Sequence, residues 1–525
     1  MKSATPSQPP WTSVRTLPEL LLARADLTPN APALRAPGID LDAKALLGVV
    51  RRLAAEFANR GVSPGDQVGL CVPRGHLPFL TSAALLWLGA SYVPLDPSHP
   101  AERLQYVLRD VGVRRIFVAD AAADVVAPHG RDIQLVPDLT LDTAHEHTEV
   151  PMSAIGDGLA YVLHTSGSTG RPKGVPIRHR NVLAMIRGFC PLFTFDTDEV
   201  WPLLHAYTFD VSVWEMWGGV AAGACLVTVD DRQARDPWAL AMHLANAGVT
   251  TLHIVPSVFR HVAETVVEES LEVPLRKVVF AGERLNRAAV RTWRNHGSGS
   301  ATFWFNVYGI TETTVYNSFH AVRPADLDTD RPTTPIGRPA PGSSMRVVGE
   351  DLRELPPGEA GELLISGPQL SEGYVGLPDL TRERFVTAPD GSGPWYRTGD
   401  VTVADEAGVL HFVGRLDDQV KVRGVRIELG EIEHALRSLP WLRDAAVVTT
   451  VSRRGEVQLA AAIVPTHGVG GDIDLTERDW AAKVREELAN ILPWGMLPQR
   501  IIAVDRLPQN SSGKLDRPEV TLLFG

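Results

Sequence analysis

The feature that most constrains the fold of this 525-residue chain is a regular alternation of short apolar runs with amphipathic stretches of helical period. An amphipathic stretch at 43–59 ends before Gly61 and is followed by the strand-like run 67–72. The same alternation recurs at 237–255 and at 286–307. Short helices between apolar strands predict right-handed crossovers and largely parallel sheets covered by helices on both faces. Ligands of such sheets bind at the carboxyl ends of the strands.

Beyond residue 331 the sequence changes to short strand-like runs separated by Gly and Pro turns, at 345–348, 362–366 and 409–414. This pattern is typical of antiparallel strands, and it predicts a small antiparallel β subdomain.

A second change follows Asp417, where two helical and two strand patterns occur within about 100 residues and predict a small α+β unit. The whole chain is too long for one hydrophobic core. We therefore predict an α/β protein with two domains. Residues 1–416 form a large amino-terminal region of two doubly covered α/β sheets and the antiparallel β subdomain, and residues 417–525 form a mobile α+β carboxyl-terminal domain.

A loop of small and hydroxylated residues at 164–174 directly follows an apolar run. Glycines let backbone N–H groups approach an anion, hydroxyls add donors, and Lys173 adds a positive charge. The loop is not a P-loop, because Pro172 and Gly174 flank the lysine and leave no neighbouring hydroxyl for magnesium. Taken alone, it also suits a solvated connector. The expected phosphate-binding residues are Thr165, Ser166, Gly167, Ser168, Thr169, Gly170 and Lys173.

Three later segments carry groups that suit a nucleotide. Residues 308–312 follow a strand and supply a tyrosine ring that can stack on adenine and a carboxylate that can hold magnesium. The turn at 396–400 ends in an aspartate, an acceptor-only group suited to a ribose diol. A glycine loop near the carboxyl terminus carries Lys514.

Composition limits the partners. The net charge of −11 argues against a nucleic-acid groove or an anionic membrane as partner, since both need clustered Lys and Arg. The first 13 residues lack the apolar core of a signal peptide. Cys71, Cys190 and Cys225 are widely separated in apolar surroundings and are expected to be buried. We expect a cytoplasmic protein.

The order and spacing of these motifs resemble the adenylate-forming superfamily, and most closely the adenylation domains of nonribosomal peptide synthetases. The resemblance extends over nearly the whole chain. Its motifs lie at 88–97, 164–174, 209–215, 308–312, 361–363, 396–400, 423–433 and 513–514.

The resemblance implies a two-step reaction, in which a carboxylate attacks the α-phosphate of ATP with Mg²⁺ to form an acyl adenylate, and a thiol then displaces AMP. It implies that Lys514 bridges the substrate carboxylate and the nucleotide, while Thr165 and Lys173 orient pyrophosphate. Asp417 corresponds to the family's hinge. The remaining implied nucleotide ligands are Tyr308, Gly309, Thr311, Glu312 as the magnesium ligand, Asp400 and Arg415.

For the substrate, the resemblance implies that Asp210 pairs with an α-ammonium group, as in amino-acid-activating members. As an isolated residue, Asp210 also suits the start of a helix. The other implied pocket residues are Val211, Trp214, Ile254, Val279, Ala281, Val307, Val315, Tyr316 and Lys514. Because this lining is almost wholly apolar, we expect an apolar amino acid, branched aliphatic rather than aromatic.

The resemblance further implies transfer to the phosphopantetheine thiol of a carrier protein. The sequence favours a freestanding enzyme that loads a carrier in trans, and a domain excised from a larger synthetase stays an alternative; an MbtH-like activator is a further possible partner. Two alternatives remain, an acyl-CoA ligase of the same superfamily and a catalytically silent nucleotide-binding protein.

Overall fold

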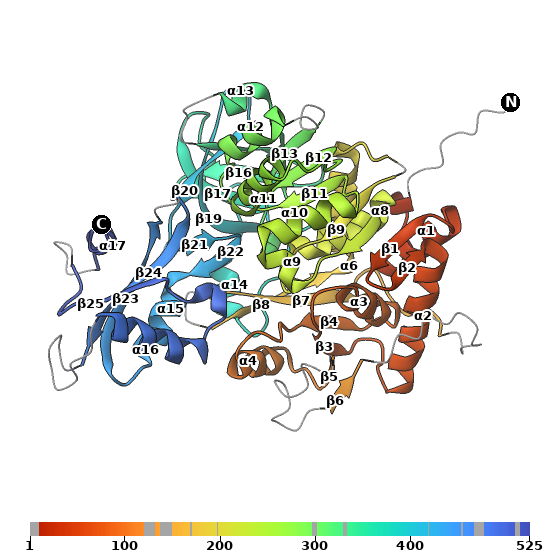
Figure 1. Ribbon diagram of the computed structural model, residues 1–525, viewed down its shortest axis with the longest axis horizontal. Coiled ribbons are helices and arrows are strands. Elements are labelled where there is room, and N and C mark those ends of the chain that lie inside the picture. Colours follow the sequence, from red (N-terminus) through yellow and green to blue (C-terminus); the bar gives the residue numbers. More distant parts are fainter. Residues whose placement is uncertain are drawn as a thin grey trace. The chain divides into compact units, whose positions relative to one another are not determined.

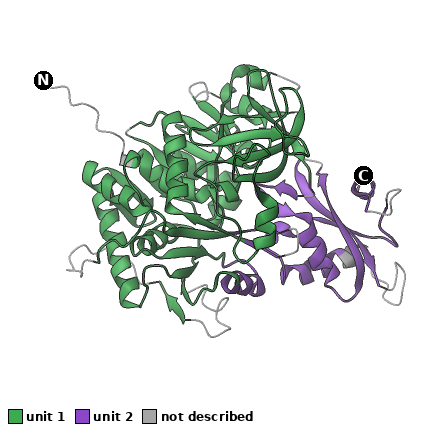
Figure 2. Ribbon diagram, turned by 180° about the vertical axis from the view of Figure 1, so that it is seen from behind, with its two compact units in different colours: residues 1–96, 110–163, 174–416 green, residues 97–109, 164–173, 417–525 purple. Residues whose placement is uncertain are grey.

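The structure is a computed structural model, and it describes residues 10–119, 132–136, 150–167, 171–196, 198–296, 302–328, 333–417, 419–452, 455–466, 477–509 and 515–525. The chain forms two compact units, coloured separately in Figure 2. Unit 1 comprises Met1–Asp96, Asp110–Leu163 and Gly174–Leu416. Unit 2 comprises Pro97–Arg109, His164–Lys173 and Asp417–Gly525, so the loop expected to bind phosphate is grouped with the carboxyl-terminal residues.

The first sheet has six strands in the order β6-β5-β3-β4-β7-β8, and its first four pairings are parallel. Its strands are β3 (Gln67–Cys71), β4 (Ser91–Pro94), β5 (Arg115–Val118), β6 (Asp132–Leu135), β7 (Leu159–Thr165) and β8 (Lys173–Arg178). The helices in this part of the chain are α1 (Leu17–Leu27), α2 (Ala43–Asn59), α3 (Leu77–Trp87), α4 (Ala101–Val111) and α6 (His179–Phe189). The alternation of helix and strand is visible in Figure 1.

The second sheet begins with three parallel strands, β11 (Thr251–Ile254), β12 (Lys277–Phe280) and β13 (Phe303–Tyr308). It continues through antiparallel pairings in the order β13-β14-β15-β20-β19-β17-β16, with β18 paired to β19. These strands are β14 (Ser318–Ala321), β15 (Thr334–Pro339), β16 (Ser344–Val348), β17 (Ala360–Ser366), β18 (Phe385–Val386), β19 (Trp395–Ala404) and β20 (Leu410–Arg415). The predicted antiparallel subdomain is therefore continuous with the second sheet.

Helix α11 (Pro256–Glu268) packs against both α10 (Pro237–Asn246) and α12 (Arg287–Asn295). Leu240, Phe259 and Trp293 on these helices share a core cluster with Val278 and Phe280 of β12. Burial of one apolar stripe of each helix against the sheet stabilises this layer.

A third sheet of four strands, in the order β2-β1-β10-β9, was not expected from the sequence. Its strands are β1 (Pro32–Ala36), β2 (Ile39–Asp42), β9 (Val200–Leu203) and β10 (Cys225–Thr228). Between β9 and β10 lie α7 (Val211–Val213), the π-helix η4 (Trp214–Gly218) and α8 (Gly219–Ala222). Unit 1 thus has three sheets among its described residues, where the sequence predicted two and a separate subdomain.

Unit 2 contains the hairpin β21 (Gln419–Val422) and β22 (Val425–Glu428) and a three-stranded sheet in the order β23-β24-β25. Its other elements are α15 (Leu429–Arg437), β23 (Leu442–Val451), β24 (Val457–Pro465), α16 (Glu477–Ala489), η7 (Trp494–Met496), β25 (Arg500–Ala503) and α17 (Arg517–Leu522). This confirms the predicted α+β character of the carboxyl-terminal region.

The shorter elements elsewhere are η1 (Pro10–Thr12), η3 (Cys190–Leu192), α9 (Asp231–Arg235), η6 (Thr311–Thr313), α13 (Pro324–Leu327) and α14 (Pro378–Arg384). Cys71, Cys190 and Cys225 are buried free thiols, as predicted. Within the part of the chain that the structure covers, no helix combines the length and the apolar character needed to cross a bilayer.

Candidate functional site

Three residues expected to bind the nucleotide meet on interior strands of the second sheet. Tyr308 ends β13, Arg415 ends β20, and Asp400 on β19 is the cross-strand partner of Arg415. The Tyr308 hydroxyl donates to one Asp400 oxygen, and the Arg415 guanidinium donates to the other at 2.5 Å. Burial together with the Asp400 charge raises the pKa of Tyr308 well above its usual range, so the hydroxyl stays protonated. The three side chains are therefore fixed as one buried group.

Glu312, the expected magnesium ligand, lies in η6 and is fully buried. The hydroxyls of Tyr374 and Tyr396 donate to its Oε1 atom at 2.8 and 3.0 Å. Hydrogen bonds of this kind orient a carboxylate that binds metal, and Mg²⁺ is commonly held by one or two carboxylates together with substrate phosphates. The donor set around Glu312 therefore fits the proposed ion.

The segment after Tyr308 is held in an unusual backbone conformation. Thr314 and Val315 have φ values of +58° and +68°, a region that β-branched residues rarely adopt. A Cβ atom on Gly309 would lie 2.1 Å from the Val315 carbonyl oxygen and 2.7 Å from the Tyr316 Cα atom. Gly309 is therefore required because the strained turn folds back over it, and this contact sets the positions of Val315 and Tyr316.

Asp210 is hydrogen-bonded to residues 308–312, which are expected to bind the nucleotide and which we call the nucleotide segment. It precedes α7, but its side chain makes no capping hydrogen bond to that helix. Instead, the Thr311 hydroxyl donates to Asp210 Oδ2 at 2.7 Å. The aspartate expected to bind the substrate thus contacts Thr311, which precedes the expected magnesium ligand Glu312.

Most residues expected to line the substrate site share one core cluster. It contains Trp214, Val279, Ala281, Val307, Val315 and Tyr316, with Val211 packed against it. Ile254 belongs instead to a different cluster, with Phe259 and Phe280.

The pairing register between β11 and β12 explains why Ile254 belongs to a different cluster from the other expected pocket residues. His253 pairs with Val279 on β12, whereas Ile254 pairs with Phe280, and paired residues of neighbouring strands point to the same face. The Trp214 indole Nε1 donates to His253 Nε2 at 3.2 Å. His253 therefore occupies the site face. A polar residue in an otherwise apolar buried strand was the sequence signal that could have identified it.

The glycine-rich loop is described within unit 2. Thr165 ends β7 and Lys173 begins β8, and Lys173 is 6% exposed. A Cβ atom on Gly167 would lie 2.0 Å from the Arg171 carbonyl oxygen, so the loop closes tightly on itself. Ser168, Thr169, Gly170 and Lys514 lie outside the described residues.

Helix α15 contacts this loop within unit 2. Glu431, in its first turn, accepts from Gly167 N at 3.3 Å and forms an ion pair with Arg103 at 2.5 Å. The Ser166 hydroxyl donates to the Arg426 carbonyl at 2.9 Å. A carboxylate of the chain itself thus lies at a backbone N–H of the loop.

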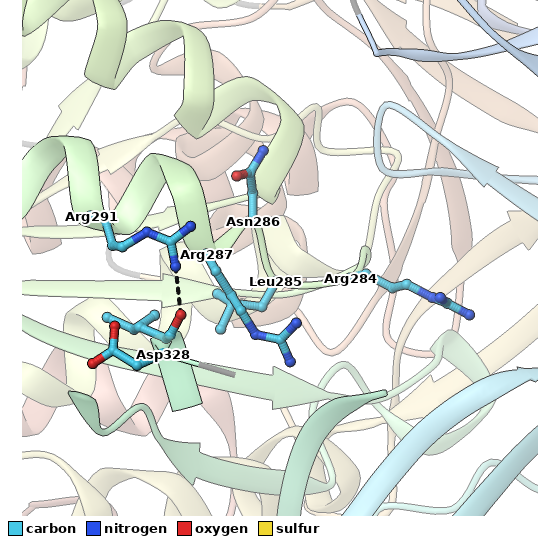
Figure 3. A pocket seen from close by; sticks show the side chains of 7 residues that line it. Arg284, Leu285, Asn286, Arg287, Arg291 and Asp328 are labelled. Carbon is cyan, nitrogen blue, oxygen red and sulfur yellow. Dashed lines mark hydrogen bonds between the residues drawn. The ribbon is translucent and has the colours of Figure 1, made fainter. Parts of the chain in front are cut away.

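A surface pocket of about 610 Å³ lies elsewhere in unit 1 and is lined by Arg284, Leu285, Asn286, Arg287, Arg291, Leu327 and Asp328 (Figure 3). Arg287 donates to the carbonyls of Asp326 and Thr333, and Arg291 donates to that of Leu327. These arginines tie α12 to the α13 region. None of the residues expected to bind nucleotide or substrate lines this pocket.

Two family models match the chain. Residues 21–375 match the AMP-binding enzyme family, and residues 431–514 match the AMP-binding enzyme C-terminal domain. The two matches together extend over most of the chain.

Curated relatives include nonribosomal peptide synthetases. The chain is 37% identical to the "Dimodular nonribosomal peptide synthase" of Bacillus subtilis, with 95% of this chain and 21% of the relative covered. It is 32% identical to "Syringomycin synthase SyrB1" of Pseudomonas syringae pv. syringae, with 96% of this chain and 81% of the relative covered. The chain thus spans a fifth of the first relative and most of the second.

Two solved structures that contain adenylation domains are also similar to this chain. An NRPS protein containing adenylation and PCP domains, bound to a vinylsulfonamide inhibitor, is 27% identical with a TM-score of 0.81, over 96% of this chain and 84% of that chain. An artificially fused adenylation–PCP di-domain NRPS from Klebsiella oxytoca is 27% identical with a TM-score of 0.79, over 93% of both chains.

Proposed function

Because the chain belongs to the family of AMP-binding enzymes, which are adenylate-forming ligases that use ATP, we propose that it activates the carboxyl group of an α-amino acid as an aminoacyl-AMP. In the proposed second step, the aminoacyl group passes to the phosphopantetheine thiol of a carrier protein. The resemblance to nonribosomal peptide synthetase adenylation domains supports both steps.

One observation supports an amino acid over other carboxylic acids. The Asp210 carboxylate lies beside the nucleotide segment and accepts from Thr311, rather than capping the helix that it precedes. A carboxylate in this position can pair with an α-ammonium group, and a substrate without that group would gain nothing from it. The substrate's own carboxylate would then lie toward the nucleotide.

The other site residues have complementary proposed roles. Glu312 would hold Mg²⁺, and Tyr308 with Asp400 and Arg415 would bind the adenosine part of ATP. Lys173 and Thr165 would orient pyrophosphate, and Lys514 would bridge the substrate carboxylate and the nucleotide. Attack of one anion on another requires charge neutralisation and positioning, which is what these residue types supply.

For the second step, Asp417 is the proposed hinge, since it begins the carboxyl-terminal segment of unit 2. Two of the solved relatives join an adenylation domain to a PCP domain, which supports a carrier protein as the thiol partner. We propose loading in trans, with an MbtH-like protein as a possible activator.

The first step is tested by amino-acid-dependent exchange of pyrophosphate into ATP, over the proteinogenic amino acids. We expect exchange with an amino acid, and a loss of about 100-fold or more in Asp210→Asn, the scale for removing one partner of a desolvated charge pair. Asp40→Asn is the matched control, because Asp40 forms an exposed ion pair with Arg35. Lys514→Ala should lose activity on the same scale. Absence of exchange with any amino acid would overturn the proposal.

The second step is tested by offering the adenylating enzyme a phosphopantetheinylated carrier protein or free coenzyme A. We expect mass spectrometry to show aminoacylation of the carrier. Faster thioester formation with coenzyme A would favour the acyl-CoA ligase alternative.

A further inference from the structure

The side chain of the activated amino acid can be inferred from three buried residues, Trp214, His253 and Tyr316, which we call the Trp214 cluster. All three are at most 2% exposed. The Trp214 ring lies 5.9 Å from the His253 ring and 6.0 Å from the Tyr316 ring, as measured between centroids. The cluster shares a unit with Asp210 and the nucleotide segment.

The hydrogen bond to Trp214 fixes the tautomer of His253. An indole N–H can only donate, so His253 Nε2 must be the acceptor. Burial, with a contribution from the neighbouring His205, lowers the pKa of His253 to about 3, so the ring is neutral at physiological pH. The single ring proton is then on Nδ1. This buried N–H has no hydrogen-bond partner in the portion of the chain that the structure covers.

The Tyr316 hydroxyl is the other polar group of the Trp214 cluster that has no partner among the described residues. Burial and the charges of Glu215 and Asp210 raise the pKa of Tyr316 well above its usual range. The hydroxyl therefore lies within electrostatic reach of the carboxylate that we expect to bind the α-ammonium group. Negative charges attract the proton of a nearby hydroxyl, so they favour an orientation in which the oxygen lone pairs face away from them.

Native proteins rarely leave such groups unsatisfied, and an unsatisfied buried donor costs about 1–3 kcal/mol. The aromatic rings of Phe189, Trp201 and Phe193 pack around Trp214 at centroid distances of 5.9–6.2 Å, so a bulky substrate side chain would compete with these rings. Glu215 is also fully buried and is paired with His205 at 2.7 Å, so a second carboxylate would be repelled. These features favour a short and neutral polar side chain.

We propose that the amino acid activated by this enzyme carries a hydroxyl group on a short side chain, as serine and threonine do, and that His253 and Tyr316 select it. The hydroxyl oxygen accepts from His253 Nδ1–H, and its proton is donated to the Tyr316 oxygen. This inference rests on the proposed function and differs from the apolar side chain expected from the sequence. The difference arises because His253 pairs with Val279, one of the expected pocket residues, whereas Ile254 pairs with Phe280.

Pyrophosphate exchange with threonine and valine tests the inference, because these substrates have the same shape and differ in one hydroxyl. Serine and 2-aminobutyrate form a second such pair. We expect kcat/KM for the hydroxylated member to exceed that for its partner by at least tenfold, since a site built to bind a hydroxyl rejects analogues that lack it. In Tyr316→Phe and in His253→Phe, this ratio should fall about tenfold, because each variant loses a group that contacts the hydroxyl of threonine and valine has no such hydroxyl.

The matched control is Tyr92→Phe, which removes another buried tyrosine hydroxyl without a described partner, outside the Trp214 cluster. It should leave the threonine-to-valine ratio unchanged, and thermal melting establishes that each variant is folded. Higher kcat/KM with valine, leucine, phenylalanine or asparagine than with threonine and serine would overturn the inference and leave amino acid activation intact. An unchanged ratio in both cluster variants would also overturn it. Failure of every amino acid would instead overturn the proposed function.

Discussion

Two buried polar clusters lie next to each other in unit 1, and they differ in how completely their hydrogen bonds are satisfied. The Glu199 cluster consists of Glu199, Trp201, Thr250, Thr251 and Lys277, and the Trp214 cluster is its neighbour. Strand β11 supplies Thr251 to the first cluster and His253 to the second. The Trp201 ring lies 4.8 Å from the His253 ring, so Trp201 borders both.

Glu199 accepts from the side chains of four residues, with the shortest distances to Lys277 at 2.6 Å and Thr251 at 2.7 Å. Burial alone would raise the pKa of Glu199, but these bonds outweigh it and lower the pKa to about 2. The Trp214 cluster, in contrast, leaves one donor and one hydroxyl without described partners. The comparison indicates that the first cluster stabilises the fold, and the unpartnered groups of the second are the reason for proposing that a ligand completes it.

The largest expected effect is on the stability supplied by the Glu199 cluster. Glu199→Gln removes the closer counter-charge of the buried Lys277 ammonium and leaves Asp196 at 4.0 Å, and breaking a buried pair in this way typically costs about 3–5 kcal/mol. Urea unfolding measures this loss. Glu264→Gln is the control, since it removes an exposed i,i+4 pair with Arg260 and should cost about 0.5 kcal/mol or less. A Glu199→Gln variant as stable as the control would contradict the structural role of the cluster.

The second prediction tests whether the turn that folds over Gly309 positions Tyr316. Gly309→Ala puts a methyl group against the Val315 carbonyl, which forces a backbone shift at a cost of about 1–3 kcal/mol. We expect the threonine-to-valine ratio of kcat/KM to fall about tenfold or more. Gly414→Ala is the matched control, because a Cβ atom there would meet nothing within 4 Å. Equal ratios in both variants would show that the turn does not position the hydroxyl.

The motif segments were predictable from the sequence because each motif is a local run of residues. The contacts of Tyr308 with Asp400, and of Asp400 with Arg415, follow from motifs whose order along the chain is characteristic. The α+β carboxyl-terminal region followed in the same way from local periodicity.

The third sheet and the position of His253 depend on contacts between residues far apart in the sequence, so local patterns did not predict them. The third sheet pairs Leu34 with Leu226, and four-residue strands give too weak a periodicity for such a pairing to be predicted. The assignment of His253 to the site required the register between β11 and β12, because a one-residue slip exchanges the two faces of a strand. Lys514 and the hinge at Asp417 stay predictions.

The third prediction concerns proton uptake by the Trp214 cluster. His253 has a pKa of about 3 in the folded protein and about 6.5 when unfolded, so below pH 6.5 the unfolded chain binds one more proton. Stability therefore rises with pH between these values and is lost as the pH falls from 6.5. Between pH 7.5 and 5.5 the wild type should lose about 1.4 kcal/mol more than His253→Phe in urea unfolding. Parallel pH dependences would contradict a neutral, buried His253.

The smallest expected effects are on stability, when one hydroxyl group is removed from each cluster. Thr251→Val removes a donor to Glu199 and should cost about 1 kcal/mol or slightly more, because the bond is to a charged group. Tyr316→Phe removes a hydroxyl without a described partner, so we expect a change within about 0.5 kcal/mol, or a slight stabilisation, when no substrate is bound. Urea unfolding of both variants without substrate gives these values.

When threonine and ATP are added, we expect Tyr316→Phe, rather than Thr251→Val, to be the variant that differs from the wild type in the stability gained. Ligand that binds only the folded state raises its stability according to its affinity. The wild type and Thr251→Val should therefore gain more stability from these substrates than Tyr316→Phe does, because only Tyr316→Phe lacks a group that contacts the side-chain hydroxyl. A Tyr316→Phe variant that is destabilised as much as Thr251→Val before any ligand is added would mean that its hydroxyl already has a partner in the fold. The distinction between the two clusters would then disappear.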